Sequence, residues 1–85
     1  MKYRVTYTKS ARDDLAEAWL SASDRNALSI ESHRVEQLLS FDPFRMGESR
    51  ESPLERVITE PPLGVWFDII PDDNKVIIQA VWLIE

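Results

Sequence analysis

The chain has 85 residues, 44% of them hydrophobic, which is enough for one core but too short for a second domain, so we expect a single domain over residues 1–85. It contains no cysteine, which excludes a disulfide framework, a thiolate metal site and a cysteine nucleophile. Ten Lys and Arg against fifteen Asp and Glu give a net charge of −5, so binding to nucleic acid must be local or absent, because a negative domain gains little from releasing counterions.

Neither membrane insertion nor secretion is indicated. No apolar run approaches the roughly 20 residues of a spanning helix. The first residues, MKYRVTYTKS, alternate apolar and polar side chains and form no continuous apolar signal segment. The lack of cysteine fits a reducing compartment. We therefore expect a soluble, cytoplasmic protein.

Residues 2–8 predict a β-strand with one buried face. Tyr3, Val5 and Tyr7 alternate with polar side chains, and most of the segment consists of residues that favour strands. The three apolar residues should therefore point into a core, while the polar ones point to solvent.

Two helices are predicted next. The first should begin at Ser10, whose hydroxyl can accept a free backbone N–H, and the second at Ser23 or Asp24. The lone His33 lies opposite the apolar side of the second helix, which indicates a solvated residue and not a catalytic base. We interpret both apolar stripes as core, including Trp19: they are Ala11, Leu15, Ala18, Trp19 and Ala22, then Ala27, Leu28, Val35, Leu38 and Leu39.

Residues 42–55, DPFRMGESRESPLE, predict a long loop. The segment carries two prolines, one glycine and mixed charges without apolar periodicity. Loops beyond about 12 residues in a compact domain are usually functional or mobile. This loop is therefore the first place to search for a site, and Phe44 and Met46 are expected to attach it to the core.

The remaining residues predict three strands in succession, at about residues 56–59, 65–70 and 76–84, separated by the breaks EPPLG and PDDNK. Successive strands with short turns pair antiparallel. The last strand is apolar on both faces, which indicates an internal position beside the N-terminal strand. The predicted fold is α+β: an N-terminal strand, a two-helix hairpin and an antiparallel three-strand meander, forming one four-stranded sheet.

Four stretches carry a resemblance to a known family: YRVTYTKSARDDL, DPFRMG, PLGVWFDI and VIIQAVW. Together with the predicted order of elements, they resemble RelE/ParE toxins of bacterial toxin–antitoxin pairs over nearly the whole chain. None of them is a catalytic motif, so the resemblance implies the fold more directly than an activity.

In nuclease members of that family, the resemblance implies cleavage of ribosome-bound mRNA by 2′-hydroxyl attack. Such a reaction needs a base, an acid for the leaving oxygen and cations for the developing charge. The family places Arg, His or Tyr at the end of its last strand, whereas this sequence has AVWLIE there. The remaining catalytic candidates are Glu51 as a base with Arg50 and Arg56 as phosphate clamps; solvated loop charges are the competing interpretation.

We therefore expect a toxin-like protein that binds a cognate antitoxin and lacks the usual ribonuclease residues, with no cofactor and no metal. One alternative is an active toxin, either a ParE-like inhibitor of DNA gyrase or a ribosome-dependent mRNA endoribonuclease. Another is an unrelated protein-interaction domain. The expected partner-binding surface consists of large apolar side chains that would otherwise complete the core, Phe44, Met46, Trp66 and Trp82.

Overall fold

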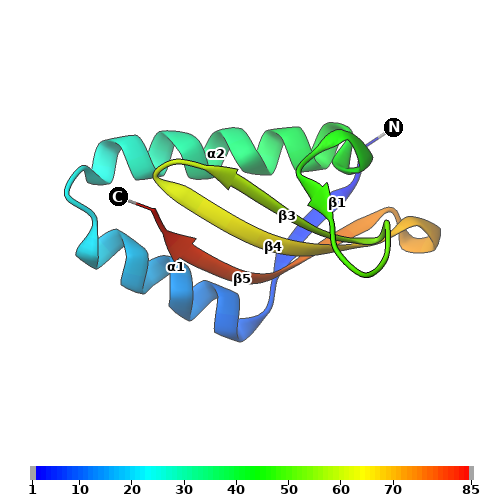
Figure 1. The fold of residues 1–85 in the computed structure, drawn as a ribbon, viewed down its shortest axis with the longest axis horizontal. Coiled ribbons are helices and arrows are strands. Elements are labelled where there is room, and N and C mark those ends of the chain that lie inside the picture. The colour runs from blue at the N-terminus through cyan, green and yellow to red at the C-terminus, as the bar shows by residue number, and fades with distance from the viewer. Residues whose placement is uncertain (1, 85) are drawn as a thin grey trace.

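The computed structural model describes residues 2–84 and has the predicted α+β order of elements (Figure 1). A strand and two helices come first, then a long connection and three strands. The elements are β1 (Arg4–Tyr7), α1 (Lys9–Ser21), α2 (Arg25–Phe41), the 3₁₀ turn η1 (Pro43–Arg45), β2 (Glu48–Ser49), β3 (Glu55–Glu60), β4 (Leu63–Ile70), the 3₁₀ turn η2 (Pro71–Asp73) and β5 (Lys75–Leu83).

The strands form one sheet in the order β1-β5-β4-β3-β2. As predicted, β5 is internal and β1 lies beside it; these two strands run parallel, whereas the other pairs are antiparallel. The sheet has five strands and not the predicted four, because Glu48 and Ser49 of the long connection pair with Val57 and Arg56. Periodicity could not reveal a strand of two residues.

The helices begin where side-chain oxygens accept backbone N–H groups. Asp24 caps α2 by accepting from the N–H of Ala27 at 3.0 Å, as one of the two predicted starts required. The predicted cap of α1 was wrong: Thr8, not Ser10, accepts from the N–H of Ala11 at 3.0 Å. Thr8 has extended backbone angles directly after β1, so its hydroxyl faces the first turn of α1.

Both helices pack on one face of the sheet, and their buried side chains form the core with the inward residues of the strands. Val35, Leu39, Phe67 and Ile78 are buried there, as predicted. The buried hydrophobic residues are Ala11, Ala18, Leu28, Val35, Leu39, Ile58, Leu63, Val65, Phe67, Ile69, Val76, Ile78 and Val81.

The prediction that Trp19 belongs to the core was wrong, because its side chain is 44% exposed. The small residues Ala11 and Ala18 form the buried side of α1, so this helix lies close to the sheet and leaves no room for an indole beneath it. Trp19 therefore lies on the flank of α1 that faces α2. His33 is exposed, as predicted.

Within residues 2–84, no helix is long and apolar enough to cross a membrane.

Candidate functional site

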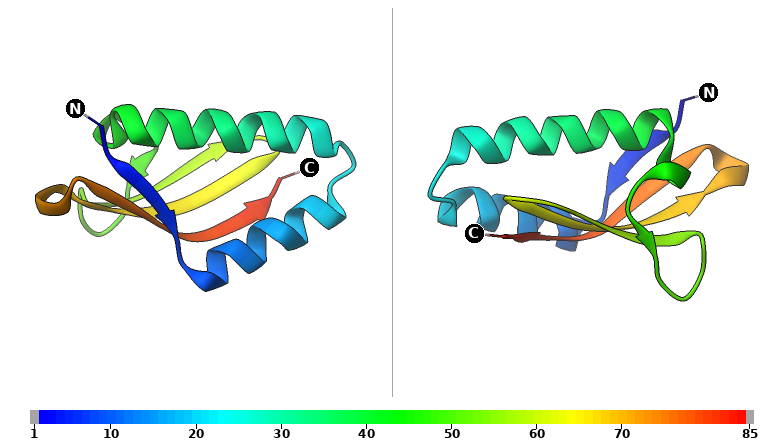
Figure 2. Two further views of the ribbon diagram at one scale, coloured as in Figure 1. Left: turned by 180° about the vertical axis from the view of Figure 1, so that it is seen from behind. Right: turned by 45° about the horizontal axis from the view of Figure 1, so that its top comes forward.

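A wide hollow lies between the two helices. In Figures 1 and 2, α1 and α2 lie close together at their connecting turn and spread apart toward the other end. The space between them is an apolar groove with a volume of about 700 Å³. We call it the helical groove; its lining residues are Tyr7, Arg12, Leu15, Ala16, Trp19, Leu20 and Glu36.

Apolar side chains are left open to solvent in the helical groove. Leu20 is 69% exposed and Trp19 44% exposed, although both are large and apolar. A groove with open apolar walls is the usual docking site for an amphipathic helix. The sequence contained a signal for it, because Leu15, Ala16, Trp19 and Leu20 form a second apolar stripe beside the buried alanines of α1.

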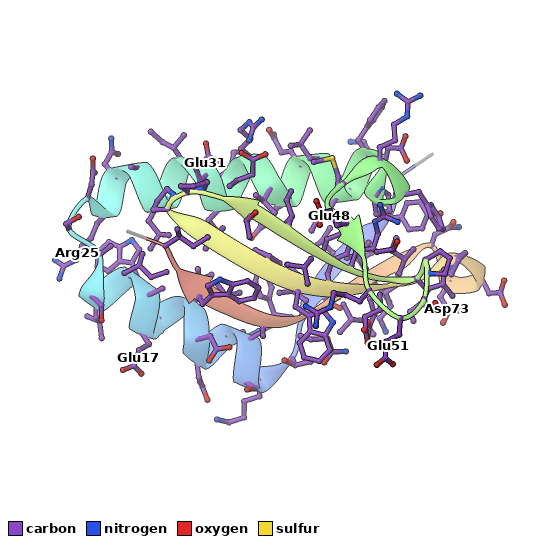
Figure 3. All side chains as sticks on the ribbon, in the orientation of Figure 1. Glu17, Arg25, Glu31, Glu48, Glu51 and Asp73 are labelled. Atoms are coloured by element: carbon purple, nitrogen blue, oxygen red, sulfur yellow. The ribbon has the colours of Figure 1, made fainter. Side chains whose placement is uncertain are left out.

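Trp19 is held in place by the start of α2. Its indole N–H donates to the hydroxyl of Ser29 at 3.1 Å, and the guanidinium of Arg25 lies 4.9 Å from the ring centroid. The same guanidinium donates to the carbonyls of Trp19 and Leu20 at 2.9 and 3.1 Å. Arg25 (labelled in Figure 3) thus fixes the end of α1 and the indole together. A partner would lose little side-chain entropy at this position.

A partly buried hydrogen bond lies at the floor of the helical groove. The phenol of Tyr7 on β1 donates to the carboxylate of Glu36 on α2. Burial, and then the hydrogen bond to Glu36, raise the pKa of Tyr7 well above its usual range. The hydrogen bond therefore joins β1 to α2.

Two of the predicted catalytic residues, Arg50 and Glu51, lie in the connection between β2 and β3, and the third, Arg56, lies near the start of β3. Arg50 and Glu51 are exposed, and Figure 3 shows Glu51 at the end of this loop, pointing away from the sheet. Arg56 lies on β3, half-buried and facing the helical side. Of the three, Arg50 lines a hollow beside β2 and β3 that neither Glu51 nor Arg56 lines.

Arg56 has a structural role in the loop. Its guanidinium donates to the carbonyls of Met46 at 2.7 Å, Gly47 at 3.1 Å and Pro53 at 3.3 Å. These bonds join the segment before β2 to the segment after it, so the guanidinium closes the loop on itself. In this arrangement its donors are not directed at a phosphate.

The end of β5 carries apolar side chains. Trp82 and Leu83 occupy the last positions of the strand, and the backbone N–H of Ile84 donates to the carbonyl of Pro62 at 2.7 Å. Within residues 2–84, no group of three or more His, Asp or Glu side chains is placed to hold a metal ion.

The four predicted partner-binding residues lie on two sides of the molecule. Phe44 is 41% exposed and contacts the ring of Tyr3 edge-on at 6.4 Å, and Met46 packs against the core. Trp66 and Trp82 lie on the opposite face of the sheet, each 38% exposed. The two tryptophans thus share a face of the sheet that Phe44 and Met46 do not share.

No protein-family model and no curated protein matches the chain. Its fold is nevertheless that of RelE/ParE toxin–antitoxin proteins, because solved structures of that class match nearly its whole length. A chain of the RelBE2 toxin–antitoxin complex from Mycobacterium tuberculosis is similar with a TM-score of 0.75 and 21% identity, covering 98% of this chain and 92% of that one.

Two further solved structures are similar to this chain over nearly its whole length. A chain of the RelE–RelB complex from the archaeon Pyrococcus horikoshii has a TM-score of 0.70 and 16% identity, covering 98% of this chain and 96% of its own. A chain of the chromosomal ParDE system from P. aeruginosa has a TM-score of 0.67 and 18% identity, with 99% and 98% covered. At these identities the comparisons confirm the fold that the resemblance implied, and not an activity.

Proposed function

We propose that this protein is the toxin-like component of a type II toxin–antitoxin pair and binds a cognate antitoxin. The observation that carries the proposal is a fold shared over nearly the whole chain with structures solved as toxin–antitoxin complexes. The open apolar helical groove supports it independently, because it offers a docking surface that the chain leaves unfilled.

The antitoxin segment that fits the helical groove is an amphipathic helix. Its apolar side chains would lie against Leu15, Trp19 and Leu20, while the exposed Arg12 would face its polar side. Trp19 is the anchor of this surface, because aromatic residues with fixed orientation contribute most to interfaces.

Ribonuclease activity is not part of the proposal. Arg56 is engaged with three backbone carbonyls, Glu51 points away from the sheet, and Trp82, Leu83 and Ile84 stand where the family places catalytic side chains. A reaction that lacks its acid and its phosphate clamp loses several orders of magnitude in rate.

Inducible expression in bacteria tests the toxin-like role. The chain is expressed alone, together with the small protein encoded beside it, and together with that protein but carrying Leu20→Glu. Growth arrest relieved by the neighbour, with relief lost in the variant, is the expected pattern for an active toxin. If the chain arrests no growth but co-purifies with the neighbour, and Leu20→Glu abolishes the co-purification, the protein is a non-toxic antitoxin-binding protein and the proposal holds. Absence of binding between the chain and the neighbour contradicts the proposal.

A further inference from the structure

The face of the sheet that the helices leave bare carries two tryptophans. Trp66 lies opposite Val57 of β3 and Ala80 of β5, and Trp82 lies opposite Gly64. This register makes the tryptophans diagonal neighbours, at a spacing of about 7–8 Å that aromatic side chains can bridge. Each is 38% exposed, so the bare face presents an aromatic surface on a rigid element.

Gly64 fixes the orientation of Trp82. A Cβ atom at position 64 would lie 2.2 Å from Cε2 and 2.3 Å from Nε1 of Trp82, so the indole lies directly on the glycine backbone. Any larger residue at this position would push the ring away. The indole is therefore already flat against the sheet and loses little freedom when a partner covers it.

Two carboxylates lie next to the tryptophans on the same face. Glu55 of β3 is directly opposite Asp68 of β4, and Asp68 is the next outward residue of β4 after Trp66. Both are half-buried, and Gln79 donates to Asp68 Oδ2 at 2.8 Å, which fixes that carboxylate. Like charges directly opposite each other destabilise a sheet unless a cation lies between them.

Within residues 2–84, no ion pair neutralises Glu55 or Asp68. Arg50, whose backbone N–H donates to the carbonyl of Glu55, and Lys75, which lies opposite Ile70, border the carboxylates. Yet the ion pairs recorded within residues 2–84 join Lys9 to Asp13, Arg34 to Glu31 and Glu60, and Arg45 to Asp42. Glu55 and Asp68 therefore remain available to a cation from another molecule.

We propose that this bare face docks an arginine-bearing segment of a partner protein. A guanidinium fits between Glu55 and Asp68 and stacks on Trp66, since it combines charge with a planar surface that suits an indole. Apolar side chains of the same segment would cover Trp82 and Val57. An RNA strand would place phosphates against Glu55 and Asp68, which disfavours nucleic acid on this face. The surface lies opposite the helical groove, so the inference goes beyond antitoxin binding there.

A ¹H–¹⁵N NMR titration can test this proposal, because the chain has three tryptophans and one of them is an internal control. The probe is a short synthetic peptide with arginine and leucine at alternating positions. We expect the indole N–H signals of Trp66 and Trp82 to move, while that of Trp19 in the helical groove stays in place. The same peptide with glutamate for arginine should move none of the three.

A matched pair of double variants separates the site from general charge attraction. Glu55→Gln with Asp68→Asn removes two negative charges at the proposed site, and Asp72→Asn with Asp73→Asn removes two at the turn η2. The first variant should bind the peptide about tenfold more weakly or worse, and the second about as well as wild type.

Four results would overturn the proposal. The first is equal weakening of peptide binding in both double variants, and the second is a shift of the Trp19 indole signal together with the other two. The third is a shift of the Trp66 and Trp82 signals caused by a short oligouridylate instead of the peptide. The fourth is a concentration-dependent shift of these signals without any peptide, which would assign the face to a second copy of this chain. Retention of the native spectrum by each variant excludes unfolding as the cause of weaker binding.

Discussion

Protonation of Tyr7, at the floor of the helical groove, makes the free energy of unfolding depend on pH in the alkaline range. Its raised pKa means that the folded protein keeps the phenol proton at a pH where the unfolded chain has lost it. The stabilisation is thus fully present below the unfolded pKa of about 10 and is lost as pH rises above it. We expect the alkaline fall in unfolding free energy to be smaller in Tyr7→Phe than in wild type, as measured by urea denaturation at several pH values. An equal fall in both proteins would mean that Tyr7 is not the coupled group.

Leu39 tests the position of the second helix. It is fully buried between α2 and the sheet, so Leu39→Ala removes apolar contacts and leaves a cavity. We expect a loss of about 2–5 kcal/mol in unfolding free energy. Leu38→Ala, one position away and only half-buried, is the control and should cost less. A loss below about 0.5 kcal/mol for Leu39→Ala would show that this face of α2 does not contact the sheet.

The guanidinium of Arg56 joins the two halves of the loop between α2 and β3. Arg56→Met leaves the carbonyls of Met46, Gly47 and Pro53 without their donor, and we expect it to destabilise the protein by about 2 kcal/mol. Arg50→Met makes the same change at an exposed position of the same loop and should stay within about 0.5 kcal/mol of wild type. Thermal unfolding measures the loss of stability in each of the two variants. Equal losses would contradict a structural role for Arg56.

The elements could be predicted from sequence where a periodic pattern extends over several residues. The alternation in β1 and β4 and the apolar stripe of α2 placed these elements correctly. The predictions that were wrong concern features that depend on distances between elements in the folded chain. The pairing of Glu48 with Val57 forms only after Gly47 turns the chain with a φ of +69°, and a helical stripe does not say how near its helix lies to the sheet, which is why Trp19 was placed in the core.

The prediction of the candidate sites was limited in the same way, because the sequence does not show which residues lie together in the folded chain. The predicted catalytic and partner-binding residues were chosen by type and by place in the chain, whereas the structure groups them by face. It brings Trp66 and Trp82 together, separates both from Phe44, and uses Arg56 to close a loop. The stripe of Leu15, Ala16, Trp19 and Leu20 indicates one apolar wall of the helical groove, but the groove itself depends on the angle at which two helices diverge.

At the scale of the whole molecule, the fold does not determine the chemistry. The chain has the fold of the RelE and ParE structures, a net charge of −5, and the apolar residues Trp82 and Leu83 at the end of β5. We expect purified protein to leave ribosome-bound mRNA uncut above background. Cutting that disappears in both Arg50→Ala and Glu51→Ala, with the fold intact, would establish a ribonuclease in place of the non-catalytic protein proposed above.

The most direct test of the central claim is calorimetric titration of this protein with the small protein encoded beside it. Wild type is compared with Leu20→Glu in the helical groove and with Ile30→Glu, a control of the same kind at an α2 position that is 58% exposed. We predict tight binding by wild type and Ile30→Glu, and binding weakened by about a hundredfold or more in Leu20→Glu, because a charge would replace an apolar contact of the interface. Absence of binding by folded wild-type protein, or equal affinities in all three, would contradict the account.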